Sequence, residues 1–328
     1  MKVFSISLLL LGFCFLLANR DITMFYDAEN YADYYHAVII GNPVNAESSF
    51  IFISQVVDFL GLGLSGLFFA YAFFGFFLKI AFYVFKLPKY IHLILLYLSS
   101  YFVVHDLVQI RIGAALGISL WAIYFIGKNN ILRATTLFII AVGIHLSALI
   151  LCFFSIFFFL INKIKERNKI FYSLSLIIFL LSIIILLSNV LFGFSLKSLI
   201  VSVSDYTDWI PLRYKENYFD SDVKIGFGKV LYSLALGVIA LIYLKHRYCQ
   251  NFLSTYSAVS VVFAFLILVT MADFPVIGAR IADTFLFLSP LMVYGVYLIN
   301  KISGRILFFS MLTIQLINIL YFSTVIKL

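Results

Sequence analysis

Long apolar segments follow one another along almost the whole chain, and most are about as long as a membrane-spanning helix. About 20 apolar residues in a helix cross a hydrocarbon layer of roughly 30 Å, whereas soluble helices keep one polar face. The pattern therefore predicts an all-α polytopic membrane protein, in which residues 1–328 form a single integral membrane domain. The predicted spans lie at about 3–18, 64–85, 90–104, 107–126, 170–190, 229–245, 253–271, 284–300 and 306–326.

Two apolar segments need separate interpretation. The run Val3–Ala18 follows Lys2 and has the length of a signal peptide, but the residues around Ala18 form a poor cleavage site, which favours an uncleaved first span. The run Phe50–Leu60 is interrupted by Gln55 and Asp58 and is too short to cross a bilayer. We expect it to be interfacial or re-entrant.

The run Ala134–Leu160 is flanked by two basic loops, Lys128–Arg133 and Lys163–Lys169. A single crossing would place these loops on opposite sides, although Lys and Arg collect on the cytoplasmic side of membrane proteins. We therefore predict a hairpin of two short half-spans that breaks at Gly143-Ile144-His145. With this hairpin the chain has about 10–11 transmembrane helices.

Composition supports the membrane assignment, since 64% of the residues are hydrophobic and only 12% are charged. The net charge of +8 fits basic cytoplasmic loops, so it does not indicate a nucleic-acid partner. In this topology every acidic residue except Glu166 falls on the outer side, which includes a first loop at 19–49 and a long loop at 190–229. This asymmetry predicts a polar working surface on the outer face.

Ionisable residues at membrane depth are costly and are read first as functional. Arg111, which follows Asp106 and Gln109, either pairs with a carboxylate or binds phosphate oxygens through its planar guanidinium. His145 is either a structural residue or a proton acceptor. A third cluster contains Asp273, Arg280 and Asp283; here Pro275 and Gly278 are expected to break the helix, and Arg280 can pair with Asp283.

The outer loops carry the remaining candidates. The first loop contains Asp27, Tyr31 and Glu47, which are either part of a solvated acidic loop or a binding surface. The loop from Ser195 to Gly228 mixes aromatic and acidic residues, so it either binds sugars or forms an interfacial aromatic belt. The three cysteines are dispersed and no metal-ligand spacing is present, so neither a disulfide framework nor a metal site is expected.

The order of these motifs resembles the EpsG-type branch of the Wzy polysaccharide polymerases, which make O-antigen, capsule and exopolysaccharide. The resemblance covers nearly the whole chain and rests on short motifs: Asp27 with Tyr31, Glu47 with Phe50, Gln109-Ile110-Arg111 with Ala114 and Ala115, His145-Leu146-Ser147-Ala148-Leu149-Ile150, and Ala279-Arg280-Ile281.

The resemblance implies a GT-C-like glycosyltransferase in the bacterial inner membrane, with its active site facing the periplasm. Such an enzyme transfers an undecaprenyl-diphosphate-linked glycan onto a sugar hydroxyl of another lipid-linked repeat unit. It implies that Arg111 and Arg280 bind the diphosphate, and that His145, Asp27 and Glu47 are the catalytic candidates. The residues that would position the substrates are Tyr31, Gln109, Asp283 and Asp273. It further implies a metal-independent reaction without cofactors, and a chain-length regulator as a possible protein partner.

Two other functional classes are compatible with the sequence. An O-antigen ligase would use the same type of site with a different acceptor. A flippase or other transporter is less favoured, because the charges gather at one membrane face and no inverted repeat is evident.

Overall fold

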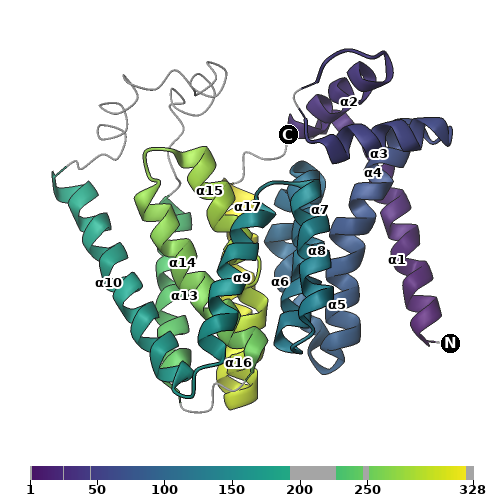
Figure 1. The fold of residues 1–328 in the computed structure, drawn as a ribbon. Helices are drawn as coiled ribbons and strands as arrows, with labels where there is room; N and C mark the ends of the chain where they lie inside the picture. The colour runs from purple at the N-terminus through teal and green to yellow at the C-terminus, as the bar shows by residue number, and fades with distance from the viewer. Residues whose placement is uncertain (1, 25, 45, 193–226, 247–250, 323–328) are drawn as a thin grey trace. The chain divides into compact units, whose positions relative to one another are not determined.

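The structure is a computed structural model that describes residues 2–24, 26–44, 46–192, 227–246 and 251–322. Within these ranges the secondary structure is helical and contains no strand (Figure 1). The prediction of an all-α polytopic membrane protein is confirmed. Nearly all of the predicted loop at 190–229 lies outside the described residues.

Seven helical segments of the described chain are long and apolar enough to cross a membrane, and four apolar helices are shorter. The seven are Gly63–Lys86, Pro88–Val108, Ile110–Gly127, Arg167–Leu191, Gly228–Lys245, Phe252–Thr270 and Pro275–Ile299. The four shorter ones are Ser5–Ala18, Ser48–Phe59, Ile131–Ile144 and Ala148–Asn162.

The chain divides into two compact units, one formed by residues 1–159 and 306–328 and the other by residues 160–305. In the first unit, the C-terminal helix α17 (Lys301–Phe322) returns to the early spans. Its Gln315 accepts a hydrogen bond of 2.6 Å from Ser99, and its Phe308 ring contacts the His92 ring. The other helices of this unit are α1 (Lys2–Ala18), η1 (Ile22–Met24), α2 (Tyr26–Ile39), α3 (Ser48–Phe59), α4 (Gly63–Ala72), η2 (Phe73–Phe77), α5 (Leu78–Lys86), η3 (Pro88–Leu93), α6 (Ile94–Leu96), η4 (Tyr97–Val108), α7 (Ile110–Gly127), α8 (Ile131–Ile144) and α9 (Ala148–Asn162), the last of which continues into the second unit.

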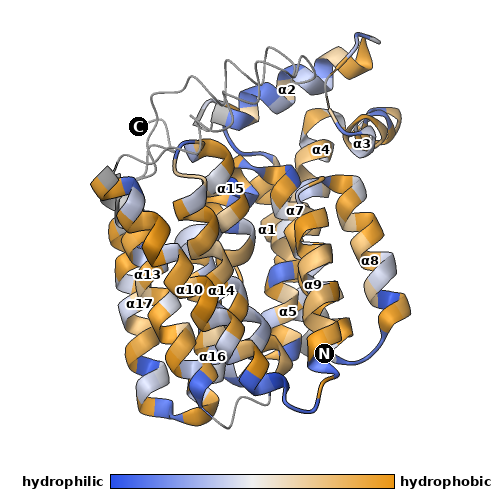
Figure 2. Ribbon diagram, turned by 60° about the vertical axis from the view of Figure 1, so that its left-hand side comes forward, coloured by the Kyte–Doolittle hydropathy of each residue, from blue (hydrophilic) through white to orange (hydrophobic). Residues whose placement is uncertain are grey.

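Two of these helices lie at one end of the first unit. Figure 1 shows α3 lying across the end of α4, next to α2. Figure 2 shows many hydrophilic residues along α2. At 12 residues, α3 is too short to span, as the sequence predicts for Phe50–Leu60. The acidic segment that precedes it is helical, because α2 extends over 14 residues of the predicted first loop.

Glycines allow helix α7 to approach η2 and η4 closely. A Cβ atom on Gly117 would collide with the carbonyl oxygen of Phe74, and one on Gly113 would collide with that of His105. A Cβ atom on Gly75, in η2, would likewise collide with the carboxylate of Asp106. Small residues spaced by four positions are a common means of close helix packing in membranes.

The helix predicted at 90–104 ends later than the sequence predicts. A break is expected at His105-Asp106, but the π-helix η4 continues to Val108, and the backbone leaves helical geometry at Gln109. The reason is that both residues are buried, and the Asp106 carboxylate has hydrogen-bond donors inside the unit. A paired carboxylate can therefore remain in a continuous helix.

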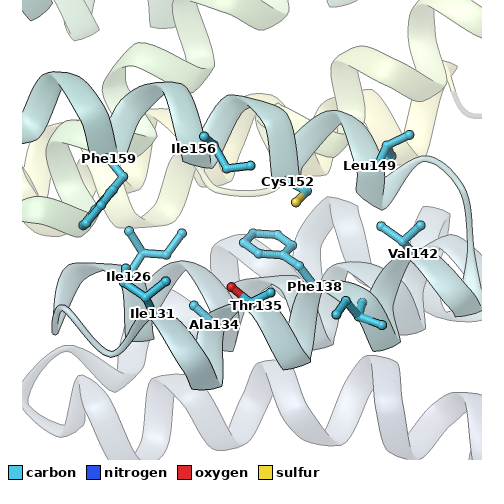
Figure 3. Close-up of a pocket in the computed structure, with 11 residues that line it drawn as sticks. Ile126, Ile131, Ala134, Thr135, Phe138, Val142, Leu149, Cys152, Ile156 and Phe159 are labelled. Atoms are coloured by element: carbon cyan, nitrogen blue, oxygen red, sulfur yellow. The ribbon is translucent and has the colours of Figure 1, made fainter.

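The predicted hairpin is confirmed. Helix α8 ends at Ile144 and α9 begins at Ala148, so the chain turns at His145, which has extended backbone angles. The two helices lie side by side (Figure 3). Helix α8 packs against α7 and α3, and the first unit includes α9 as far as Phe159.

The second unit is built around α14, which packs against α10, α13, α15 and α16. The expected helix break at Gly278 is wrong. Gly278 lies inside α15, where a Cβ atom would collide with Met271, so close packing is the reason for a glycine there. The helices are α10 (Arg167–Phe192), α13 (Phe227–Lys245), α14 (Phe252–Thr270), α15 (Pro275–Leu286) and α16 (Ser289–Ile299).

Candidate functional site

The strongest cluster of polar side chains lies in the first unit, where three separate segments bring Glu47, Arg111 and His145 together. Glu47 immediately precedes helix α3, and Arg111 is the second residue of α7. His145 occupies the turn between α8 and α9. Each residue therefore sits where a helix begins or ends, which leaves the three side chains free to converge.

The carboxylate of Glu47 is the centre of the cluster. Arg111 Nη1 donates to Glu47 Oε2, and His145 Nε2 lies 3.5 Å from Glu47 Oε1. The side chains of Glu47, Arg111 and His145 are 27%, 17% and 22% exposed, so the cluster is accessible but mostly shielded. Of the two interpretations left open for Arg111, pairing with a carboxylate is therefore observed.

The turn around His145 determines its tautomer. The backbone N–H of Ser147 donates to His145 Nδ1 at 3.1 Å, and the Ser147 hydroxyl lies 2.8 Å from the same nitrogen. Since a backbone N–H can only donate, Nδ1 must be the acceptor. In the neutral ring the proton is then on Nε2, directed at Glu47. A donor nitrogen of the neutral His145 ring therefore lies next to the Glu47 carboxylate.

An aromatic wall supports the arginine. The guanidinium carbon of Arg111 lies 5.3 Å from the Tyr31 ring centre and 5.6 Å from that of Phe50. Phe50 is fully buried and contacts the rings of Tyr31, Tyr34 and Tyr71. Contacts of this kind stabilise a cation at a site that is partly removed from water.

Several polar atoms of this region lack a hydrogen-bond partner among the described residues. These are Arg111 Nε, Gln109 Oε1 and the Tyr71 hydroxyl. Buried polar atoms usually have a partner, from the protein, water or a ligand. Arg111 therefore has donor capacity beyond its contact with Glu47.

The remaining predicted residues of the first loop are placed on helix α2. Asp27 lies in its first turn, one turn before Tyr31, so the two share a face. Tyr35 donates a 2.9 Å hydrogen bond to Asp58 and thereby joins α2 to α3. Burial and this hydrogen bond raise the pKa of Tyr35 to about 12. This hydrogen bond holds the acidic helix α2 against α3, which contains Phe50 and follows Glu47 directly.

A second polar cluster in the first unit was not identified from the sequence. Lys79 Nζ donates to both carboxylate oxygens of Asp106, and Tyr97 also donates to Asp106. Arg20 donates to the Asp106 carbonyl oxygen at 3.1 Å and stacks on Phe68. A lysine inside one span and an aspartate at the end of the next are the signals that could have predicted this pair.

The predicted residues Asp273, Arg280 and Asp283 belong to the second unit. Asp283 pairs with Lys229 at 2.8 Å, a partner that the sequence does not indicate, whereas the sequence leaves a pairing with Arg280 open. The reason is that Lys229 at the start of α13 reaches α15, where it also lies 3.5 Å from the Ala279 carbonyl oxygen. The aromatic and acidic loop candidates between 193 and 226 lie outside the described residues.

No group of three or more potential metal ligands is found among the residues that the structure describes. The candidate site instead combines a carboxylate, a guanidinium and an imidazole at the end of a bundle of apolar helices. These groups can accept a proton and stabilise an anion, which are the requirements of a membrane-embedded group-transfer enzyme.

Comparison with protein families agrees with this class. The model of the EpsG family matches residues 3–327, essentially the whole chain, and the chain therefore belongs to the EpsG family. This confirms the resemblance seen in the motifs, and the family is associated with polysaccharide polymerases. No curated protein and no solved structure matches the chain significantly.

Proposed function

We propose that this protein polymerises polysaccharide from lipid-linked repeat units. In this reaction an undecaprenyl-diphosphate-linked glycan is transferred onto the non-reducing-end sugar hydroxyl of another lipid-linked unit, at the periplasmic face of the bacterial inner membrane. Membership of the EpsG family supports the polymerase class. The observation that carries the proposal is the contact of Glu47 with both Arg111 and His145.

The reaction needs a base and an anion-binding group. A bond forms between the acceptor hydroxyl oxygen and the anomeric carbon of the donor sugar. The bond from that carbon to the diphosphate oxygen breaks, and the electron pair leaves with undecaprenyl diphosphate. The acceptor proton must be removed, and the negative charge on the leaving group must be stabilised.

Glu47 is the best placed base. A carboxylate offers about four lone-pair sites, and Arg111 and His145 occupy one on each oxygen, so the carboxylate can still accept the hydroxyl proton. His145 keeps the carboxylate oriented, because its Nδ1 is already bound to the Ser147 backbone. Asp27 remains a candidate for positioning the acceptor.

Arg111 supplies the positive charge for the diphosphate. Guanidinium carries five N–H donors, of which Nη1 contacts Glu47, while Nε has no partner among the described residues. Arg280 stays a proposed diphosphate ligand on the family resemblance alone. Tyr31 and Gln109, which flank Arg111, and Asp273 and Asp283, which lie on either side of Arg280, are proposed to position the substrates.

The proposal includes no metal ion, because a guanidinium group would stabilise the leaving group. The partners are the lipid-linked donor and acceptor, the surrounding bilayer and, in cells, a regulator of chain length. Activity in the presence of a chelator tests the metal independence. Loss of activity that a divalent cation restores would contradict it.

The test uses the purified protein in lipid vesicles, supplied only with lipid-linked repeat units. A polymerase gives a ladder of products that differ by one repeat. A ligase gives no ladder without a second lipid acceptor, and a transporter moves unchanged substrate across the bilayer. Absence of the ladder from protein that is folded and inserted would overturn the proposal.

A further inference from the structure

An apolar groove runs between helices α8 and α9 of the hairpin (Figure 3). It has a volume of about 440 Å³, in the range of pockets that hold small molecules. Ile126 from α7 contributes to one end, near Ile131 and Phe159, and Val142 and Leu149 line the other end. The whole lining belongs to the first unit.

The lining is suited to a hydrocarbon chain. Of the eleven lining residues, only Thr135 and Cys152 carry a polar side-chain atom, and the others are aliphatic or aromatic. Ile139 and Ile156 are at least half exposed, so the groove opens at the side of the hairpin. In a membrane, an opening at this position faces the hydrocarbon region, from which a lipid tail can enter laterally.

One end of the groove reaches the charged cluster. Val142 and Leu149 lie within about one helical turn of His145, whose Nε2 faces Glu47. From there to Ile131 the groove follows α8 for about 16 Å, roughly half of the hydrocarbon thickness. A molecule with an anionic head near Arg111 would therefore have its first tail segment in this groove.

We propose that the groove binds the head-proximal part of the isoprenoid tail of the lipid-linked substrate. The inference rests on the proposed function, which supplies the occupant: one apolar chain joined directly to a diphosphate. An apolar groove that ends within about one helical turn of His145, next to Arg111 and Glu47, matches this head-and-tail arrangement. Ordinary phospholipid is the alternative occupant that the experiment must exclude.

Two neighbouring threonines on α8 provide a matched pair of variants. Thr135 lines the groove and Thr136 does not, although both are exposed. Thr135→Trp should fill the groove, while Thr136→Trp adds the same side chain outside it. With substrate on the full-length isoprenoid, we expect Thr135→Trp to raise KM at least tenfold and Thr136→Trp to match the wild type.

With a substrate whose tail is too short to fill the groove, the wild type and Thr135→Trp should behave alike. Equal KM values for Thr135→Trp and Thr136→Trp on the long-tailed substrate would overturn the groove assignment. Polymerase activity of the wild type in the same assay would leave the proposed function standing. Loss of product from the wild type would instead contradict the proposed function.

A binding measurement keeps the groove testable without activity. In a Cys14→Ala, Cys249→Ser protein, Cys152 in the groove is the remaining thiol. Undecaprenyl diphosphate in phosphatidylcholine vesicles should slow maleimide labelling of Cys152 at least tenfold, and the same amount of phosphatidylglycerol should not. Equal protection by the two lipids would show that the groove holds bulk lipid and would overturn the inference.

Discussion

Lys79 Nζ lies 2.9 Å and 3.1 Å from the two carboxylate oxygens of Asp106, although the residues are 27 positions apart on different spans. Neither side chain is more than 2% exposed. Tyr97 completes the arrangement by donating to the same carboxylate. Asp106 lies five residues before Arg111, so this pair fixes the end of η4 from which the candidate site begins.

Removing one charge of the Lys79–Asp106 pair should destabilise the protein more than removing both charges. Lys79→Met leaves a buried carboxylate without its cation, and Asp106→Asn leaves a buried ammonium, each at a cost of about 3–5 kcal/mol. Because the double variant buries no unpaired charge, we expect it to be more stable than either single variant. Thermal unfolding in detergent measures this order. A double variant whose loss equals the sum of the two single losses would contradict the interpretation.

The contact of α7 with η2 predicts different effects of two glycine substitutions. Gly117→Ala places a methyl group against the Phe74 carbonyl oxygen, and overpacking of this kind costs about 1–3 kcal/mol. Gly143→Ala is the matched control, since no atom lies within 4 Å of its Cβ position. Because Gly143 lies in the last turn of α8, the control should be neutral or stabilising by less than the roughly 1 kcal/mol expected in a helix interior. Equal melting temperatures of the two variants would contradict the close packing.

The spans could be predicted from the sequence because the bilayer requires long apolar runs, whatever their partners are. The hairpin could be predicted as well, since the basic loops on both sides of Ala134–Leu160 need to be on one side. The same reasoning placed a break at His105-Asp106, where polarity is high. It failed there because Lys79 and Tyr97, from distant positions, supply the partners that keep Asp106 in the helix.

The sequence identified the residues of the candidate site but only some of the contacts between them. Arg111 and His145 stand out as ionisable residues among apolar ones, and Glu47 belongs to a motif. That Glu47 joins the other two depends on the turn before α3, which no local pattern specifies. The partner of Asp283 was not predictable, since Arg280 is near in sequence but Lys229, on another helix, is the partner observed in space.

Alkaline pH should weaken the attachment of α2 to α3. The folded-state pKa of Tyr35 is raised to about 12 by burial and by its hydrogen bond to Asp58. A raised pKa means that the stabilisation is fully present below about pH 10, the ordinary value for tyrosine, and is lost as the pH rises through 12. Between these values the melting temperature of the wild type should fall more steeply than that of Tyr35→Phe. Parallel curves would show that the bond contributes nothing.

Glu47 should be indispensable for turnover and not for folding. Glu47→Gln keeps the shape but cannot take a proton, and loss of a general base reduces rates by about 10²–10⁴-fold. Glu166→Gln is the control, because Glu166 is 71% exposed and lies outside the cluster. We expect the control to keep wild-type activity in the vesicle assay. If Glu47→Gln retained more than about a tenth of the wild-type rate, another residue would be the base.

His145 and Ser147 allow orientation of Glu47 to be separated from proton transfer. His145→Ala removes the Nε2 donor that faces Glu47, and we expect kcat to fall at least tenfold. Ser147→Ala removes only the hydroxyl contact, while the backbone N–H that fixes Nδ1 remains, so its rate should stay within a few-fold of the wild type. His145→Gln can still donate through its amide and should recover part of the lost rate. If His145 were the base itself, His145→Gln would be as inactive as His145→Ala, and the order of rates among these three variants therefore decides its role.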